Sequence, residues 1–223
     1  LILAPTRELA KQIQEAIKSF VRGSPIRVGM VVGGLSINPQ IHKLQKGMDI
    51  LVATPGRLID LLDRRAVTLE HTHYLVLDEA DQMLDLGFIH ALRQISKLLP
   101  IQKQTMLFSA TMPKLMSEIA DTYLNQPVRI EVSPPGKVAD KITQFVHFVT
   151  QGDKPDLLKK LLSHQQAKRS LVFSRTKHGA EKLMKNLIRQ GFTANSIHGN
   201  KSQGQRDRAL QAFKDGSINV LVA

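Results

Sequence analysis

The sequence lacks features that several classes of protein need. It contains no cysteine, which excludes disulfide bonds, thiolate catalysis and cysteine-based zinc sites. It has no run of about 18 apolar residues, the length that a membrane-spanning helix requires. No charged-then-apolar secretory leader is visible. These absences exclude several extracellular and membrane classes and fit a cytoplasmic protein without a membrane partner.

Aromatic residues are scarce as well, at 4% of the chain with no tryptophan. Surfaces that read an RNA sequence normally stack the bases on aromatic side chains. Their scarcity favours contacts with the sugar-phosphate backbone, which carry no sequence information.

The net charge of +12 is unevenly distributed. Residues 1–131 contain 15 Lys and Arg against 13 Asp and Glu, whereas residues 132–223 contain 16 against 6. The second part is therefore expected to attract a polyanion. The alternative is a solvated basic surface that only promotes solubility.

Three carboxylates follow a short apolar run. Residues 75–77 form a Leu-Val-Leu run typical of a buried parallel strand, and Asp78, Glu79 and Asp81 come directly after it. Charges at the end of a buried strand favour a positive ligand, and Mg²⁺ carrying nucleotide phosphates is the usual one. In that chemistry the first Asp holds the metal, usually through water, and a neighbouring carboxylate polarises the attacking water. The alternative is an acidic helix start, stabilised by the helix dipole.

Other apolar runs end in the same manner, in small, polar or basic residues. These ends are Pro-Thr-Arg-Glu-Leu-Ala at 5–10, Gly33-Gly34, Thr-Pro-Gly-Arg at 54–57 and Ser-Ala-Thr at 109–111. With Asp-Glu-Ala-Asp at 78–81, the set resembles the DEAD-box ATP-dependent RNA helicases in content and order, over essentially the whole chain. The stretch at 83–90 and the Pro-Pro-Gly-Lys at 134–137 look most like the bacterial RhlE-type subgroup.

The chain also contains an internal repeat. Residues 1–7 are echoed by 171–177 and residues 50–53 by 220–223, both at an offset of 170 residues. Each half continues with an amphipathic helix, predicted over 10–20 and 180–190, and the second half has a further helix over 206–214. The repeat predicts tandem α/β units, and the resemblance implies that they are two RecA-like domains whose parallel sheets are flanked by helices. The predicted bounds are 1–132 and 142–223, with a linker at 133–141.

The resemblance assigns roles to individual residues. Asp78 and Glu79 would hold Mg²⁺ and ATP, Glu79 would position the attacking water, and Ser109 and Thr111 would bond back to Asp81. Thr6 and Thr54 are expected to cap helices, whose N-termini favour phosphate. The residues predicted to contact the RNA backbone are Pro5, Thr6, Arg7, Gly33, Gly34, Thr54, Pro55, Gly56, Arg57, Arg175, Gln203 and Arg206.

The expected activity is ATP-dependent separation of short RNA duplexes or remodelling of RNA–protein complexes. No Gly-x-x-x-x-Gly-Lys-Ser/Thr loop occurs, since the only Gly-Lys pair, Gly136-Lys137, is followed by Val138. We therefore expect an internal fragment of a helicase, with both domains truncated and inactive alone. An RNA-binding or annealing module that acts without ATP, and a DNA helicase of related architecture, are the alternatives.

Overall fold

The computed structural model describes residues 1–131, 142–164 and 169–223. The chain divides into two compact units, Leu1–Ala139 and Asp140–Ala223. The predicted linker at 133–141 lies outside the described residues, and the predicted domain bounds stay predictions. None of the described helices is both long and apolar enough to cross a membrane.

The first unit is built on a five-stranded parallel sheet. Its order is β2-β3-β1-β4-β5, and its strands are β1 (Ile2–Leu3), β2 (Val28–Val31), β3 (Ile50–Ala53), β4 (Tyr74–Leu77) and β5 (Gln104–Leu107). Its helices are α1 (Arg7–Phe20), α2 (Asn38–Leu44), α3 (Pro55–Asp63), α4 (Ala80–Asp85), α5 (Ile89–Lys97) and α6 (Lys114–Tyr123). The parallel α/β architecture confirms the predicted fold class.

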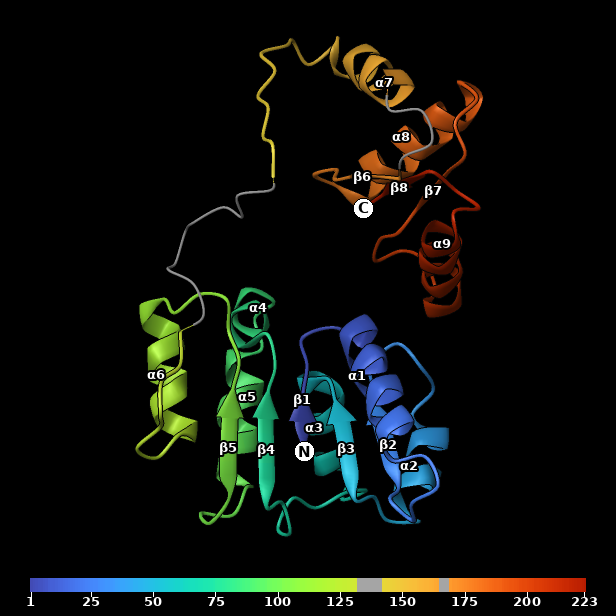
Figure 1. The fold of residues 1–223 in the computed structure, drawn as a ribbon. Coiled ribbons are helices and arrows are strands. Elements are labelled where there is room, and N and C mark those ends of the chain that lie inside the picture. Colours follow the sequence, from blue (N-terminus) through green and yellow to red (C-terminus); the bar gives the residue numbers. More distant parts are fainter. Residues whose placement is uncertain (132–141, 165–168) are drawn as a thin grey trace. The chain divides into compact units, whose positions relative to one another are not determined.

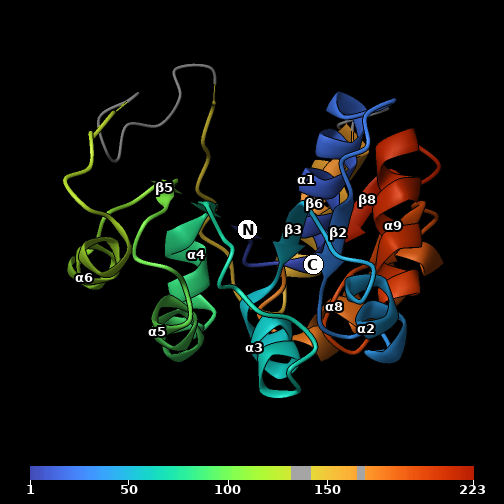
Figure 2. The same ribbon diagram turned by 90° about the horizontal axis from the view of Figure 1, so that it is seen from below.

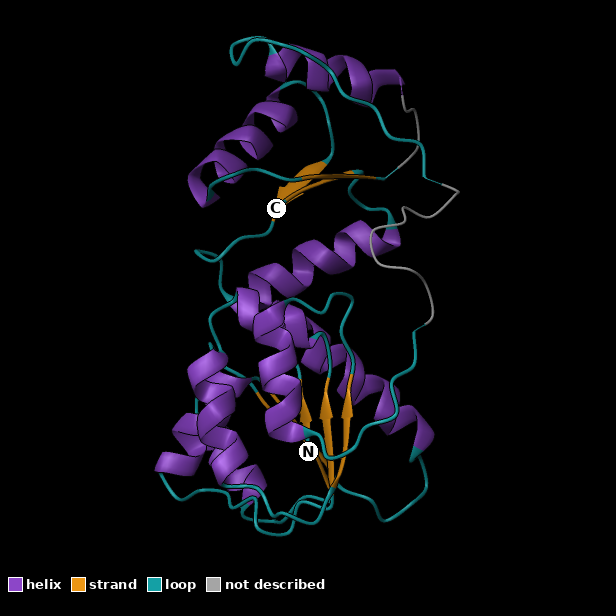
Figure 3. Ribbon diagram, turned by 90° about the vertical axis from the view of Figure 1, so that its left-hand side faces the viewer, coloured by secondary structure: helices purple, strands orange, loops and turns teal. Residues whose placement is uncertain are grey.

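Helices cover both faces of this sheet (Figures 2 and 3). Successive residues of a strand point to opposite faces, so Leu51 and Ala53 pack into one core while Val52 packs into the other. The smaller core lies under α1, and the larger one holds apolar residues of α3 and α5. A sheet buried on both faces explains why its strands are nearly continuous apolar runs.

All five strands end at the same edge of the sheet (Figure 1). Leu3 pairs with Ala53 on one side and with Leu77 on the other, and Leu77 pairs with Leu107. The polar motifs that follow these strands therefore emerge side by side. In open α/β sheets this edge is where ligands bind.

The second unit has a three-stranded parallel sheet of order β6-β8-β7. The strands are β6 (Ser170–Val172), β7 (Ala194–Ser196) and β8 (Val220–Val222), and the helices are α7 (Lys154–His164), α8 (Lys177–Arg189) and α9 (Gln203–Asp215). α8 packs against β7 and β8 through Ala180, Met184 and Leu187.

The two sheets confirm the internal repeat. The order β7-β8-β6 reproduces β2-β3-β1, and Ile2 pairs with Val52 as Val172 pairs with Val222, with both partners displaced by 170 residues. The hydrogen bond from Ala4 N to Ala53 O likewise corresponds to that from Ser174 N to Ala223 O. The second unit is thus a copy of the β1–β3 part of the first.

The apolar pattern placed the starts of three helices too late. α1 begins at Arg7 rather than Ala10, as the predicted cap at Thr6 implies, α8 begins at Lys177 rather than Ala180, and α9 begins at Gln203 rather than Arg206. The apolar pattern begins a turn after the helix itself, because the first turn is held by a capping side chain. The preceding residues Thr6, Thr176 and Ser202 accept from backbone N–H groups at 3.2, 3.0 and 3.3 Å.

Candidate active site and nucleic-acid interface

The acidic motif occupies the turn between β4 and α4. Asp78 follows the strand, and its Oδ1 accepts a hydrogen bond from Glu79 N at 3.1 Å. Glu79 has a positive φ of 49°, a left-handed conformation that costs a residue with a Cβ about 1–2 kcal/mol. Strain of this kind is concentrated at functional sites. The turn sends the chain from the buried strand into α4 and leaves the Glu79 side chain exposed.

The last carboxylate of the motif is tied to the Ser-Ala-Thr segment. Asp81 Oδ2 accepts from Thr111 N at 2.9 Å and from Thr111 Oγ1 at 2.7 Å. Partial burial raises the pKa of Asp81, but these two bonds and one from Gln82 N outweigh it and lower its pKa overall. The expected bond from Thr111 is present, whereas the Ser109 hydroxyl donates to Thr111 O at 2.6 Å instead.

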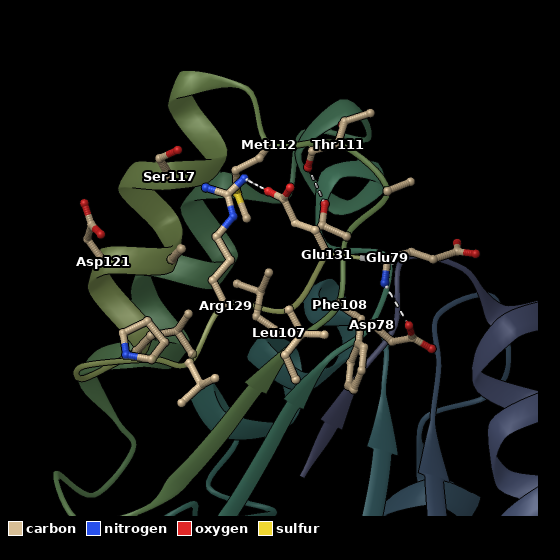
Figure 4. Close-up of a pocket in the computed structure, with 17 residues that line it drawn as sticks. Asp78, Glu79, Leu107, Phe108, Thr111, Met112, Ser117, Asp121, Arg129 and Glu131 are labelled. Carbon is tan, nitrogen blue, oxygen red and sulfur yellow. Dashed lines mark hydrogen bonds and ion pairs between the residues drawn. The ribbon is translucent and has the colours of Figure 1, made fainter. Parts of the chain in front are cut away.

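A cavity of about 700 Å³ lies beside these two motifs, between the ends of β4 and β5 and helix α6. Asp78 and Glu79 lie at one side of it and α6 with Ser117 and Asp121 at the other, and the ion pair of Arg129 with Glu131 lies between them (Figure 4). The lining mixes apolar and charged side chains, an arrangement typical of small-molecule sites.

The donor set fits a magnesium ion that is held mainly by other ligands. Among the described residues, no three His, Cys, Asp or Glu side chains are grouped to hold a metal. Mg²⁺ commonly keeps several waters and binds one or two carboxylates together with substrate phosphates. Asp78, at the end of β4 and beside the cavity, is placed for that mode of binding.

The basic and glycine-rich motifs form a second cluster at the same edge, after β1, β2 and β3. The guanidinium of Arg7 packs against Gly33 and Gly34, and Gly34 has a φ of +70°. A Cβ on Gly34 would lie 1.9 Å from Arg7 Nη1. The absence of a side chain therefore lets the loop after β2 approach the arginine at the start of α1.

The Thr-Pro-Gly-Arg motif completes this cluster. Thr54 precedes α3, but its side chain caps no N–H of that helix, so the expected capping bond is absent. Its buried hydroxyl accepts from Gly33 N at 3.4 Å, which links β3 to the loop after β2. Arg57 Nη2 donates to Leu35 O at 3.0 Å, while its buried Nη1 has no hydrogen-bond partner among the described residues.

The predicted RNA-contacting residues of the first unit are therefore brought together. Pro5 and Pro55 are buried, Gly34 and Gly56 are exposed, and Thr6, Arg7 and Arg57 are half-buried. Two helix N-termini point to this edge, and free N–H groups with a positive dipole favour phosphate. The structure does not test whether RNA contacts them.

The second unit places its predicted residues at the matching edge. Arg175 is exposed in the turn between β6 and α8. Gln203 is the first residue of α9 and donates to Asp207 Oδ1 at 3.0 Å, and Arg206 lies in the same first turn. Their contacts with RNA stay predictions.

Two polar side chains that connect separate segments, the buried Gln40 and the half-buried Glu181, escaped the sequence interpretation. Gln40 on α2 accepts from Val32 N at 3.0 Å and donates to Val32 O and Ser36 O, so it fixes the loop that contains Gly33 and Gly34. Glu181 on α8 accepts from Ser196 Oγ at 2.7 Å and lies 3.1 Å from His198 Nε2. A polar residue on the inner side of a short helix was the available signal for Gln40.

The parallel sheets, with the acidic turn and two helix N-termini at the carboxyl edge of the first, define an α/β protein. The DEAD/DEAH box helicase family model matches residues 1–119, and the helicase conserved C-terminal domain matches residues 153–223. The chain belongs to the DEAD/DEAH box helicase family.

Solved structures of the family are similar over nearly the whole chain. The yeast DEAD-box splicing factor Prp28 is 32% identical, with a TM-score of 0.57 over 100% of this chain and 52% of its own. A DEAD box protein from the hyperthermophile Methanococcus jannaschii is 36% identical, with a TM-score of 0.56 over 100% and 60%. Dbp5 from S. cerevisiae, bound to RNA and ADP BeF3, is 30% identical, with a TM-score of 0.86 over 99% and 56%. The chain thus spans little more than half the length of these relatives.

Proposed function

We propose that this chain is part of an ATP-dependent RNA helicase that separates short RNA duplexes or remodels RNA–protein complexes. The observation that carries the proposal is the pair of hydrogen bonds from Thr111 to Asp81, at 2.9 and 2.7 Å. They join the acidic turn to the segment after β5, so that a change at one is transmitted to the other. Binding of RNA and a nucleotide by the relative Dbp5 supports the same assignment.

Nucleotide chemistry is assigned to the acidic turn. Asp78 would hold Mg²⁺ through water, and the exposed Glu79 carboxylate would orient the attacking water and accept its proton. When bound there, Mg²⁺ would supply positive charge that offsets the charge of the ATP phosphates. Asp81 is held ionised by Thr111 and acts as the link to the rest of the site.

RNA binding is assigned to the cluster formed by Arg7, Gly33, Gly34 and residues 54–57, with Arg175, Gln203 and Arg206 contributing from the second unit. Guanidinium groups and helix N-termini recognise phosphates and not bases, so binding is independent of sequence. We assign about 5–6 nucleotides to this path, the scale of a small single-strand site. Closure of two domains on a nucleotide would bend the bound RNA strand, and a bent strand cannot stay in a regular duplex. Disrupting the duplex costs about 1.4 kcal/mol per base pair, if the mean stacking free energy of DNA is taken as a guide.

The finer predictions belong to this proposal. They are the domain bounds 1–132 and 142–223, membership of the RhlE-type subgroup and a cytoplasmic location.

The sequence contains no phosphate-binding loop with its lysine, and that loop cradles the nucleotide phosphates in helicases of this kind. We therefore propose that the 223-residue chain hydrolyses no ATP by itself.

An ATP-independent RNA-binding or annealing module is the second candidate. The basic part of the chain, with 16 Lys and Arg against 6 Asp and Glu over residues 132–223, favours it. The two candidates differ in whether ATP changes the RNA complex.

The test is duplex separation and RNA release by a protein in which a phosphate-binding loop precedes Leu1. A helicase separates a short RNA duplex only when ATP is added, and it releases the RNA after hydrolysis. Equal strand separation or annealing with and without ATP would establish the second candidate. A DNA duplex of the same length distinguishes the DNA helicase alternative, because the RNA helicase should leave it paired.

A further inference from the structure

A basic cavity lies on the second unit, and none of the residues predicted above to contact RNA lines it. Its volume is about 510 Å³, and it lies along α8 and beside the loop that follows β7. It is lined by Lys177, His178, Glu181, Lys182, Lys185, Arg189, His198 and Asn200. Arg175, Gln203 and Arg206 are not among these residues.

The charge of this cavity is positive, because four Lys and Arg line it against one carboxylate. Within the described part of the chain, Lys177, Lys182 and Arg189 have no carboxylate partner. Lys185 Nζ lies 3.8 Å from Glu181 Oε1 with 67% of its side chain exposed, an ion pair that contributes little in water. These cations remain available to an anionic ligand.

The single carboxylate is already engaged by other groups of the protein. Glu181 Oε2 accepts from Ser196 Oγ at 2.7 Å, and it lies 3.1 Å from His198 Nε2 and 3.5 Å from Lys201 Nζ. The hydrogen bond from Ser196, followed by that from His198, lowers the pKa of Glu181 to about 2. Its Oε2 is engaged by Ser196, His198 and Lys201, so the carboxylate offsets only part of the charge of the four cations that line the cavity.

The spacing of the cations suits a chain of phosphates. Lys182, Lys185 and Arg189 recur at intervals of three and four residues, which places them on one face of a helix. From Lys177 to Arg189 the axial distance is about 18 Å, at 1.5 Å per residue. A single small anion would use one end of such a row, whereas a nucleic-acid backbone can contact all of it.

The cavity is also continuous with the expected RNA path. α8 follows β6 directly, so Lys177 lies at the carboxyl edge of the sheet, two residues from Arg175. The helix returns along the parallel sheet, and Arg189 lies toward the opposite edge. The row of cations therefore leads away from the predicted contacts at that edge.

We propose that this cavity binds the phosphates of an RNA strand beyond the segment held at the carboxyl edges of the sheets. The inference rests on the proposed RNA binding and adds an extension site on α8 to it. Longer RNA strands occupy both sites, and strands of about 6 nucleotides occupy only the first. The contact is with the backbone, so the extension adds affinity without sequence preference.

The test compares RNA strands of about 6 and about 18 nucleotides, bound to the unmodified chain and to a Lys182→Gln, Lys185→Gln double variant. Each neutralised phosphate contributes about −0.7 to the log–log salt slope for single strands. Loss of two contacts makes the slope for the long strand shallower by about 1.4. Between about 50 and about 200 mM salt, the unmodified chain should lose about sevenfold more affinity than the variant. Binding of the short strand should be unchanged.

The matched control is Lys159→Gln, Lys160→Gln on α7, two exposed lysines of the same unit that do not line the cavity. It removes the same charge, and it should leave the long-strand slope close to that of the unmodified chain. Lys182→Arg, Lys185→Arg should retain tight binding of the long strand. Both results would support a local contact between the α8 cations and RNA phosphates over a general electrostatic attraction between a basic protein and RNA.

Three results would overturn the extension site on α8. They are a long-strand salt slope that is unchanged in the Lys182→Gln, Lys185→Gln variant, an equally large change of that slope in the α7 control, and an equally large change of the slope for the short strand. If the short strand binds normally in those cases, RNA binding by the chain stands and only the extension site is wrong. If the unmodified chain binds neither strand, the proposed RNA binding and the extension site are both wrong.

Discussion

Removing the Thr111 hydroxyl should weaken the link between the acidic turn and the segment after β5. Thr111→Val keeps the shape of the side chain and the backbone bond to Asp81 at 2.9 Å, but deletes the O–H···O bond at 2.7 Å. Hydrogen bonds to charged groups contribute about 1.5–3 kcal/mol. Thr111 is exposed, so water competes and we expect a loss of about 1 kcal/mol in the stability of the first unit.

The same substitution should raise the pKa of Asp81 toward its ordinary value. Because the folded pKa of Asp81 is lowered, its stabilising contribution is complete above the unfolded pKa of about 3.9 and is lost as pH falls through the folded pKa. The two proteins should therefore differ most in stability near neutral pH. The difference should shrink in acid, once Asp81 is protonated in both.

Two measurements follow this effect in the whole chain. Carbon-detected NMR gives the Asp81 titration directly. The only tyrosines are Tyr74 and Tyr123, both in the first unit, and the chain has no tryptophan, so tyrosine fluorescence during urea unfolding reports that unit alone. Ser109→Ala is the control, because Ser109 donates to Thr111 O and should shift the Asp81 pKa less. An Asp81 titration that is the same in Thr111→Val and in the unmodified chain would refute the reasoning.

Three further substitutions test other parts of the site. Gly34→Ala places a Cβ 1.9 Å from Arg7 Nη1 at a φ of +70° and should weaken RNA binding. The control Gly23→Ala, at a φ of +84° with nothing within 4 Å, should cost only backbone strain of about 1–2 kcal/mol. Equal RNA affinities of these two variants would contradict the role of Arg7. Ser202→Ala removes a capping box and should destabilise the second unit by about 1 kcal/mol in thermal unfolding, an effect that Ser202→Thr should largely avoid. In a protein that also has a phosphate-binding loop, Glu79→Gln should abolish ATP turnover yet permit ATP-dependent RNA clamping, and normal turnover would disprove the assignment of Glu79.

Local pattern and spacing predicted most of the fold. The offset of 170 residues between the two halves is reproduced in the pairing of Ile2 with Val52 and of Val172 with Val222. Such a repeat is detectable because the apolar strand residues that define it are contiguous in sequence. The helix starts were displaced because capping residues, and not apolar periodicity, decide where a helix begins.

Contacts between distant segments could not be derived from spacing. The bond from Gly33 to Thr54 and the approach of Arg7 to Gly34 depend on the sheet order, which places β1, β2 and β3 side by side. The link between Thr111 and Asp81 was expected only through the family resemblance. The network of Glu181 with Ser196 and His198 joins α8 to the end of β7, and no local motif indicated it.

RNA-stimulated ATP hydrolysis is the measurement that tests the central claim most directly. It compares the 223-residue chain with the same chain preceded by a phosphate-binding loop, each with and without single-stranded RNA. The account predicts hydrolysis only in the protein that has the loop, with RNA increasing its rate. Hydrolysis by the 223-residue chain alone, or none by the longer protein in the presence of RNA, would contradict it.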